Sequence, residues 1–88
     1  MYKLMIVDDE EIILDGLKNV VEWENLGIEV ISYAYNGKEA LEKIAENVPD
    51  ILITDISMPV MDGIELVREL RERGFDSIKI VFLSGYND

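Results

Sequence analysis

Short apolar runs alternate with amphipathic segments along the whole 88-residue chain, and this alternation most limits the possible folds. A short, nearly continuous apolar run is typical of a strand buried on both faces of a parallel sheet. Strand and helix patterns that alternate with short connections predict right-handed crossovers and helices on both faces of that sheet. The predicted strands cover residues 3–7, 28–35, 51–54 and 78–83.

The segments between these runs carry helix signals. Asn36 and Asp62 are each followed three residues later by a glutamate, the pattern of a helix N-terminus closed by side chains. We expect another helix from Glu10 to about Trp23, with Asp9 as its cap. Helical spacing predicts that the first helix buries Ile13, Leu17, Val20 and Val21, and the third Ile64, Val67 and Leu70.

Charge and composition exclude several functions. Eight basic against nineteen acidic residues give a net charge of −11, which argues against binding nucleic acid or anionic membranes. The absence of cysteine and histidine excludes disulfides, thiolate or imidazole metal sites and histidine catalysis. No apolar stretch approaches the roughly 18–20 residues of a membrane span, and no signal-peptide pattern is present. We therefore expect a cytoplasmic protein of one domain or less.

Acidic residues stand where two of the predicted strands end. Asp8 and Asp9 follow the first run and Asp55 follows the third, so neighbouring parallel strands would bring them to one end of the sheet. Carboxylates gathered at one point repel each other unless a cation holds them, and ligation by oxygen alone favours Mg²⁺. An aspartate in such a cluster can act as a nucleophile and form an acyl phosphate. Taken singly, Asp8 and Asp9 could be a helix cap and a surface acid, and Asp55 a loop acid. Ser84, at the end of the fourth run, could bond a phosphoryl group or simply be a turn residue.

These motifs together resemble the receiver domain of two-component response regulators. The resemblance rests on Val7-Asp8-Asp9-Glu10, on the Thr54-to-Gly63 stretch containing Met-Pro-Val-Met-Asp-Gly, and on Phe82-Leu83-Ser84-Gly85, in that order. The Asn36-Gly37 pair fits as well. Residues 23–27 and 84–88 look most like receivers that are fused to AraC-type DNA-binding domains.

The resemblance implies a role for each matching residue. Asp55 matches the phosphoryl acceptor, which receives the group from a phosphohistidine of a sensor histidine kinase, and Ser84 matches the hydroxyl that moves toward that group. Asp9 matches the direct Mg²⁺ ligand, Asp8 the acid that holds a metal-bound water, and the Ser57 backbone carbonyl a third ligand. It also implies a flavodoxin-like three-layer α/β/α fold with strand order 2-1-3-4, and a module that takes part in its own phosphorylation without being a free-standing enzyme.

The 88 residues depart from the family at their carboxyl end. Family members continue with a helix, a fifth strand that ends in a lysine, and a last helix, so residues 1–88 are expected to be the N-terminal part of a receiver. Lys79 lies inside the fourth strand and does not replace that lysine. An edge position would leave the fourth strand free to pair with a second copy or with a complementing fragment.

Other functions stay open at this point. The alternative for the chain itself is an inactive truncated or engineered half-domain that self-associates or complements another fragment. A Mg²⁺-dependent phosphatase would want Asp-x-Asp after the first strand, where this chain has Asp8-Asp9-Glu10, and no glycine-rich nucleotide-binding motif follows Val7.

Overall fold

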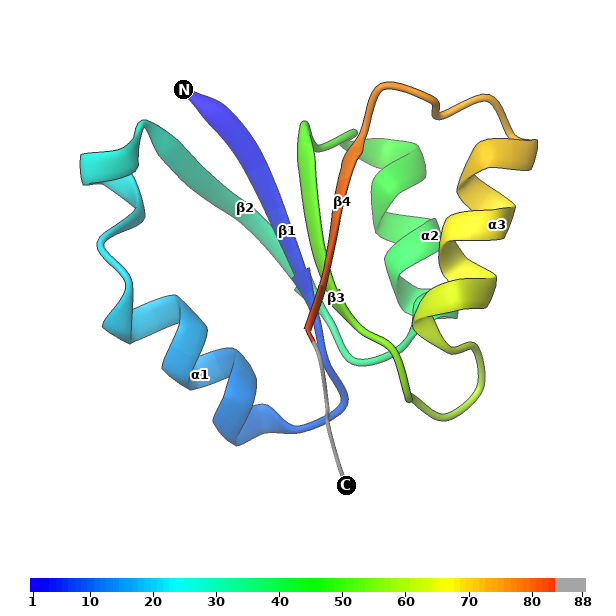
Figure 1. The fold of residues 1–88 in the computed structure, drawn as a ribbon, viewed down its shortest axis with the longest axis horizontal. Helices are drawn as coiled ribbons and strands as arrows, with labels where there is room; N and C mark the ends of the chain where they lie inside the picture. Colours follow the sequence, from blue (N-terminus) through cyan, green and yellow to red (C-terminus); the bar gives the residue numbers. More distant parts are fainter. Residues whose placement is uncertain (84–88) are drawn as a thin grey trace.

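A four-stranded parallel sheet separates two helical layers in the computed structural model, which describes residues 1–83 (Figure 1). The strand order β2-β1-β3-β4 confirms the predicted 2-1-3-4 order, and every neighbouring pair is parallel. The elements are β1 (Tyr2–Val7), α1 (Glu11–Val20), the 3₁₀ turn η1 (Trp23–Leu26), β2 (Ile28–Ala34), α2 (Gly37–Glu46), β3 (Ile51–Asp55), α3 (Gly63–Glu72) and β4 (Lys79–Leu83).

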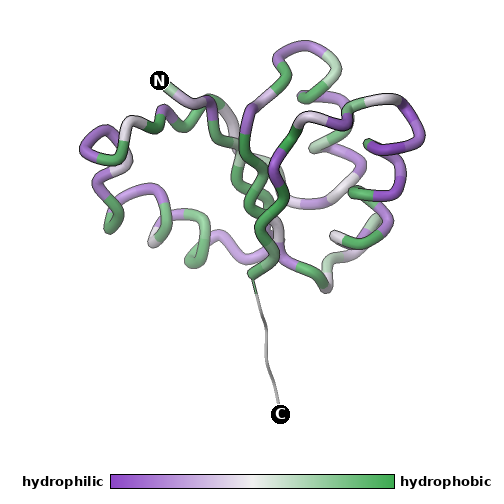
Figure 2. The backbone as a smooth tube through the Cα atoms, turned by 45° about the horizontal axis from the view of Figure 1, so that its top comes forward, coloured by the Kyte–Doolittle hydropathy of each residue, from purple (hydrophilic) through white to green (hydrophobic). Residues whose placement is uncertain are grey.

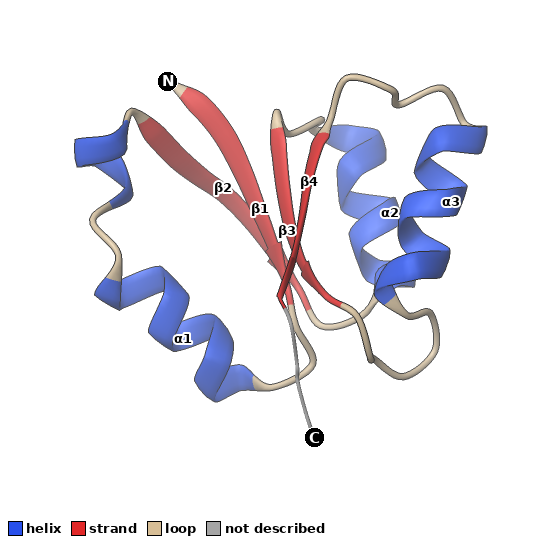
Figure 3. Ribbon diagram, viewed as in Figure 1, coloured by secondary structure: helices blue, strands red, loops and turns tan. Residues whose placement is uncertain are grey.

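The central strand β1 serves both faces of the sheet. Leu4 and Ile6 point toward α1, whereas Met5 and Val7 point toward α2 and α3, as expected for a strand whose side chains alternate. Helix α1 and the short turn η1 lie on one face of the sheet, and α2 and α3 share the other (Figure 3). The hydrophobic residues accordingly follow the strands through the centre of the molecule (Figure 2). No helix within residues 1–83 is both long and apolar enough to cross a membrane.

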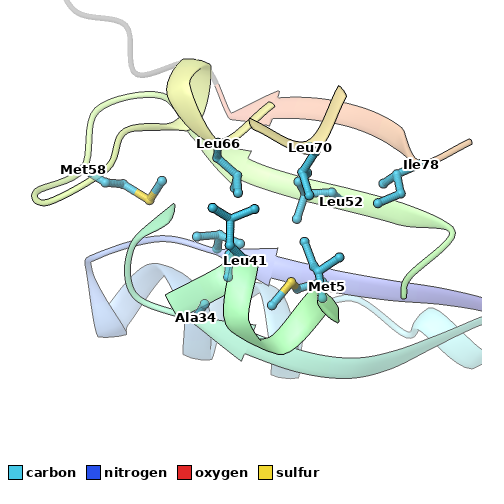
Figure 4. Packing of buried hydrophobic residues seen from close by; sticks show 11 residues of the cluster. Met5, Ala34, Leu41, Leu52, Met58, Leu66, Leu70 and Ile78 are labelled. Carbon is cyan, nitrogen blue, oxygen red and sulfur yellow. The ribbon is translucent and has the colours of Figure 1, made fainter. Parts of the chain in front are cut away.

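The larger core lies between the sheet and the helix pair α2 and α3. Leu41 from α2 and Leu66 and Leu70 from α3 meet Met5 and Leu52 of the sheet (Figure 4). All five side chains are buried. This packing holds the two helices, and hence the loops that precede them, in fixed positions relative to β1 and β3.

The first helix is shorter than predicted, and of its predicted inward residues Leu17 packs half-buried against the sheet while others do not. It ends at Val20, and Trp23 begins the separate turn η1 instead of extending the helix. The Trp23 indole N–H donates to the Leu17 carbonyl over 2.8 Å, which satisfies a backbone group at the helix end. Leu14 is the buried residue of α1, while Ile13 is exposed and Val20 is 79% exposed.

In the third helix the predicted buried stripe is confirmed at Leu70 but not at the other two positions. Leu66 and Leu70 are its buried side chains, whereas Ile64 is exposed and Val67 is only half-buried. The predicted caps of α2 and α3 are confirmed. The Asn36 side chain accepts the Glu39 N–H at 2.9 Å, and Asp62 and Glu65 form the reciprocal pair of bonds of a capping box.

Strand β2 contains one extra residue relative to β1. Leu4 pairs with Val30 but Met5 pairs with Ser32, so Ile31 is bypassed as in a β-bulge. The bulge reverses the alternation of side chains along β2. Val30 and Tyr33 therefore both face α1, although they are three residues apart.

Candidate functional site

The strand register brings the predicted acids to one end of the sheet. β1 and β3 are direct neighbours, and Val7 pairs with Thr54. Asp8 and Asp55, the residues that follow this pair, therefore leave adjacent strands at the same level. Neighbouring strands lie about 4.8 Å apart, so the two side chains start close together, although Asp55 is not part of the tight carboxylate group found within residues 1–83.

Asp8 is the buried member of the group, with only 3% of its surface exposed. Its carboxylate accepts the Glu10 N–H at 2.9 Å. Burial raises the pKa of Asp8, and the negative charges of Asp55, Asp9 and Glu10 raise it further, against the lowering effect of that hydrogen bond. The expected capping by Asp9 was wrong: Glu10 is the N-cap residue of α1, without a side-chain cap bond, and Asp8 bonds its N–H instead.

Three carboxylates follow β1 in a tight group. One oxygen each from Asp8, Asp9 and Glu10 lies within 4.8 Å of the others. Glu10 was not among the predicted ligands. Glu10 follows Asp8 by two residues, just where the chain enters α1, and this spacing is the sequence signal that could have identified Glu10 as a candidate ligand.

Asp55 ends β3 and is half-buried. Its Oδ1 accepts the N–H of Ile56 at 2.8 Å, which orients the carboxylate. The hydroxyl of buried Thr54 donates to the Asp55 carbonyl at 2.9 Å. Ser57 is exposed in the following loop, and the role of its carbonyl stays a prediction. Ser84 lies outside the described residues.

The loop between β3 and α3 is held tightly against the end of β3. The Gly63 N–H donates to the Ile56 carbonyl at 2.8 Å, and a Cβ on Gly63 would lie 2.2 Å from the Asp55 carbonyl oxygen. Only glycine allows this approach. Val60 has φ of 70°, and the Met61 N–H donates across it to the Pro59 carbonyl at 2.7 Å, which together describe a classic γ-turn.

Comparison with known proteins agrees with this geometry. The family model of the response regulator receiver domain matches residues 4–88. The chain belongs to this family. All 88 residues of the chain align with the uncharacterized transcriptional regulatory protein YesN of Bacillus subtilis at 47% identity, and they span 24% of that protein's length.

Solved structures share the fold of the receiver. A two-component transcriptional regulator AraC from Clostridium phytofermentans is 38% identical, with a TM-score of 0.86 over all of this chain and 70% of that one. One chain in the structure of the CheX–CheY–BeF₃–magnesium complex from Borrelia burgdorferi is 27% identical to this chain. The TM-score is 0.84, over 99% of this chain and 64% of the Borrelia chain. These likenesses confirm the flavodoxin-like fold.

The acids of the receiver fit a hard divalent cation. They offer carboxylate oxygens alone, the donors that Mg²⁺ prefers. The ion pairs within residues 1–83, Glu39 with Lys43 and Glu69 with Arg73, lie along α2 and α3, so no basic side chain of this segment forms an ion pair with the acids after β1. A bound cation would offset the negative charges of Asp55, Asp9 and Glu10, which help to raise the pKa of Asp8.

Proposed function

We propose that residues 1–88 form the N-terminal part of a cytoplasmic receiver that accepts a phosphoryl group on Asp55 from a sensor histidine kinase. The observation that carries this proposal is the pairing of Val7 with Thr54, from which Asp8 and Asp55 emerge side by side. The 88 residues cover 70% of the Clostridium regulator chain, which supports the proposal that they form one part of a receiver.

In the proposed reaction a carboxylate oxygen of Asp55 attacks the phosphorus of phosphohistidine. The new O–P bond is an acyl phosphate, the N–P bond breaks, and its electron pair stays on the imidazole. The Ile56 N–H, already bonded to Asp55 Oδ1, orients the nucleophile. The reaction is a transfer to the receiver itself, so the module is a substrate that assists its own modification and not a classical enzyme.

We assign Mg²⁺ to Asp9 as direct ligand, to Asp8 through water, to Asp55 and to the Ser57 carbonyl. The carboxylates of Asp8 and Asp9 lie in one group, and the Borrelia complex, a related fold, is described with magnesium. The cation, when bound, neutralises charge on the phosphoryl oxygens. We assign the Ser84 hydroxyl to a bond with the transferred group, on the basis of the resemblance.

Labelling tests the proposal directly. The 88-residue chain, incubated with Mg²⁺ and acetyl phosphate, should gain the mass of one phosphoryl group only slowly, because the lysine that pairs with this group in the family is not among these residues, and Asp55→Asn should abolish the gain. Asp76→Asn is the matched control, because Asp76 is an exposed acid beyond α3, away from the site. Labelling that survives in Asp55→Asn would contradict the assignment of the acceptor.

We also propose that β4 of the 88-residue chain pairs with a second copy. Within residues 1–83, β4 bonds only to β3, and its Val81 and Phe82 are exposed. An open, apolar strand edge is a template for another chain. Sedimentation should show dimers that Val81→Lys disperses, whereas a folded monomer at all concentrations would refute the pairing. Binding of a longer complementing fragment in place of the second copy would also refute it.

A further inference from the structure

The connection between β2 and α2 carries no predicted ligand, yet it touches both loops that do. At one end, the Ala34 carbonyl accepts the Asp8 N–H at 3.1 Å. At the other, the Gly37 N–H donates to the Met61 carbonyl at 2.9 Å. A stretch of four residues thus holds the backbone after β1 and the backbone after β3 at the same end of the sheet (Figure 1).

Gly37 makes this contact possible because it has no side chain. A Cβ there would lie 2.7 Å from Met61 Cγ and 2.8 Å from the Met61 carbonyl oxygen. Gly37 is buried, and no positive φ is recorded for it, so its requirement for glycine comes from this close approach and not from its backbone conformation.

The helix side of the contact is the more firmly held. The Asn36 side chain accepts the Glu39 N–H, and Glu39 in turn accepts the Tyr35 N–H at 2.7 Å. Ala40, Leu41 and Ile44 bury the inner face of α2. By contrast, most of the loop from Ile56 to Met61 is exposed, namely at Ile56, Ser57, Pro59 and Val60.

We infer that Gly37 is a positioning residue for the carboxylates of Asp9 and Asp55. Because Gly37 has no side chain, α2 can begin against Met61, and this contact fixes the loop that follows Asp55. The inference rests on the proposed Mg²⁺ site. An added methyl group would force the Met61 carbonyl from 2.8 Å to the 3.4 Å of ordinary contact, and the exposed loop would yield before the helix does. Mg²⁺ demands near-ideal octahedral geometry, so a displacement of its loop ligands weakens binding.

The test compares Mg²⁺ affinity in Gly37→Ala and in two control variants of the full 88-residue chain, measured by calorimetric titration. Gly16→Ala is the matched control, since a Cβ at Gly16 meets nothing within 4 Å. Ile78→Val is the stability control, because it trims a buried residue at the opposite end of the sheet. We expect Gly37→Ala to weaken Mg²⁺ binding by about tenfold or more, the range found for residues that support metal ligands, and both controls to leave it unchanged.

A second measurement does not depend on the metal. In the metal-free chain, Gly37→Ala should shift the amide resonances of Asp55 and Ile56, whereas Gly16→Ala should not. The milder variant Asn36→Ala, which loosens the start of α2 without overlap, should weaken Mg²⁺ binding in the same direction.

The outcomes separate the two ideas. Unchanged Mg²⁺ affinity in Gly37→Ala or in Asn36→Ala, with normal binding by the original chain, would overturn the positioning role alone. An original chain that does not bind Mg²⁺ would overturn both the proposed site and the positioning role. Equal weakening in Ile78→Val would show that the effect is lost stability, and would also overturn the inference.

Discussion

Replacing Val60 by glycine should stabilise the protein, although the change removes a side chain. Val60 is a β-branched residue at φ of 70°, inside a turn closed by the Pro59 carbonyl and the Met61 N–H. A residue held in such a region costs on the order of 1–3 kcal/mol, and a β-branched residue belongs toward the upper end. Glycine adopts the same conformation without that cost.

Two smaller effects oppose this gain. Glycine increases the conformational entropy of the unfolded chain, which lowers stability by about 0.4–1 kcal/mol. Val60 is 76% exposed, so its loss removes little buried apolar surface, worth about 0.4 kcal/mol for a quarter of a valine side chain. The net expectation is a gain of about 1 kcal/mol, or a rise in Tm of about 4–8 °C for a domain of this size.

Thermal unfolding followed by circular dichroism measures this effect, with Val48→Gly as the control. Val48 is also a partly exposed loop valine, and it is not among the residues with positive φ. Val48→Gly should therefore lower Tm through the greater entropy of the unfolded chain, with no gain from relieving a positive φ. If Val60→Gly lowers Tm as much as Val48→Gly does, the turn is not strained in solution and the reasoning fails.

Three further changes have defined outcomes. Asn36→Ala removes the side-chain cap of α2 and should cost about 1 kcal/mol in urea unfolding. Leu70→Ala empties a fully buried position and should cost about 2–5 kcal/mol by the same measurement. Because the pKa of Asp8 is raised in the folded protein, protonated Asp8 favours folding when no metal is bound. This stabilisation is fully present below pH 3.8, the ordinary pKa, and is lost as pH rises through the raised pKa of the folded protein. Asp8→Asn should flatten this pH dependence of Tm, and an unaltered profile would exclude Asp8 as its source.

Local signals made the strands and two helix starts predictable. The cap at Asn36 and the capping box at Asp62 and Glu65 involve residues three apart, so neighbouring sequence specifies them. The strand order followed from the resemblance to the receiver family, and it placed Asp8 and Asp55 at one end of the sheet. These were the parts of the site that sequence could provide.

Other features depend on contacts distant in sequence. α1 is rich in apolar residues, so periodicity alone did not show that Leu14 and not Ile13 would meet β1. Trp23 is held by its bond to Leu17, a contact between two elements. Nothing in the residue type of Val60 indicates a positive φ, because the turn is imposed by anchors on both sides of it. The contact of Gly37 with Met61 joins elements that only the fold brings together.

The bypassed residue in β2 marks a place where that strand can lose length. Removing Ile31 would join Val30 directly to Ser32, and both could keep their partners Leu4 and Met5 on β1. Val30 and Tyr33 would then lie two residues apart, the regular spacing for side chains on one face of a strand, so both would still face α1. Ala34 would keep its bond to the Asp8 N–H, so the sheet should absorb this deletion without moving the end of β2 that lies beside the acids.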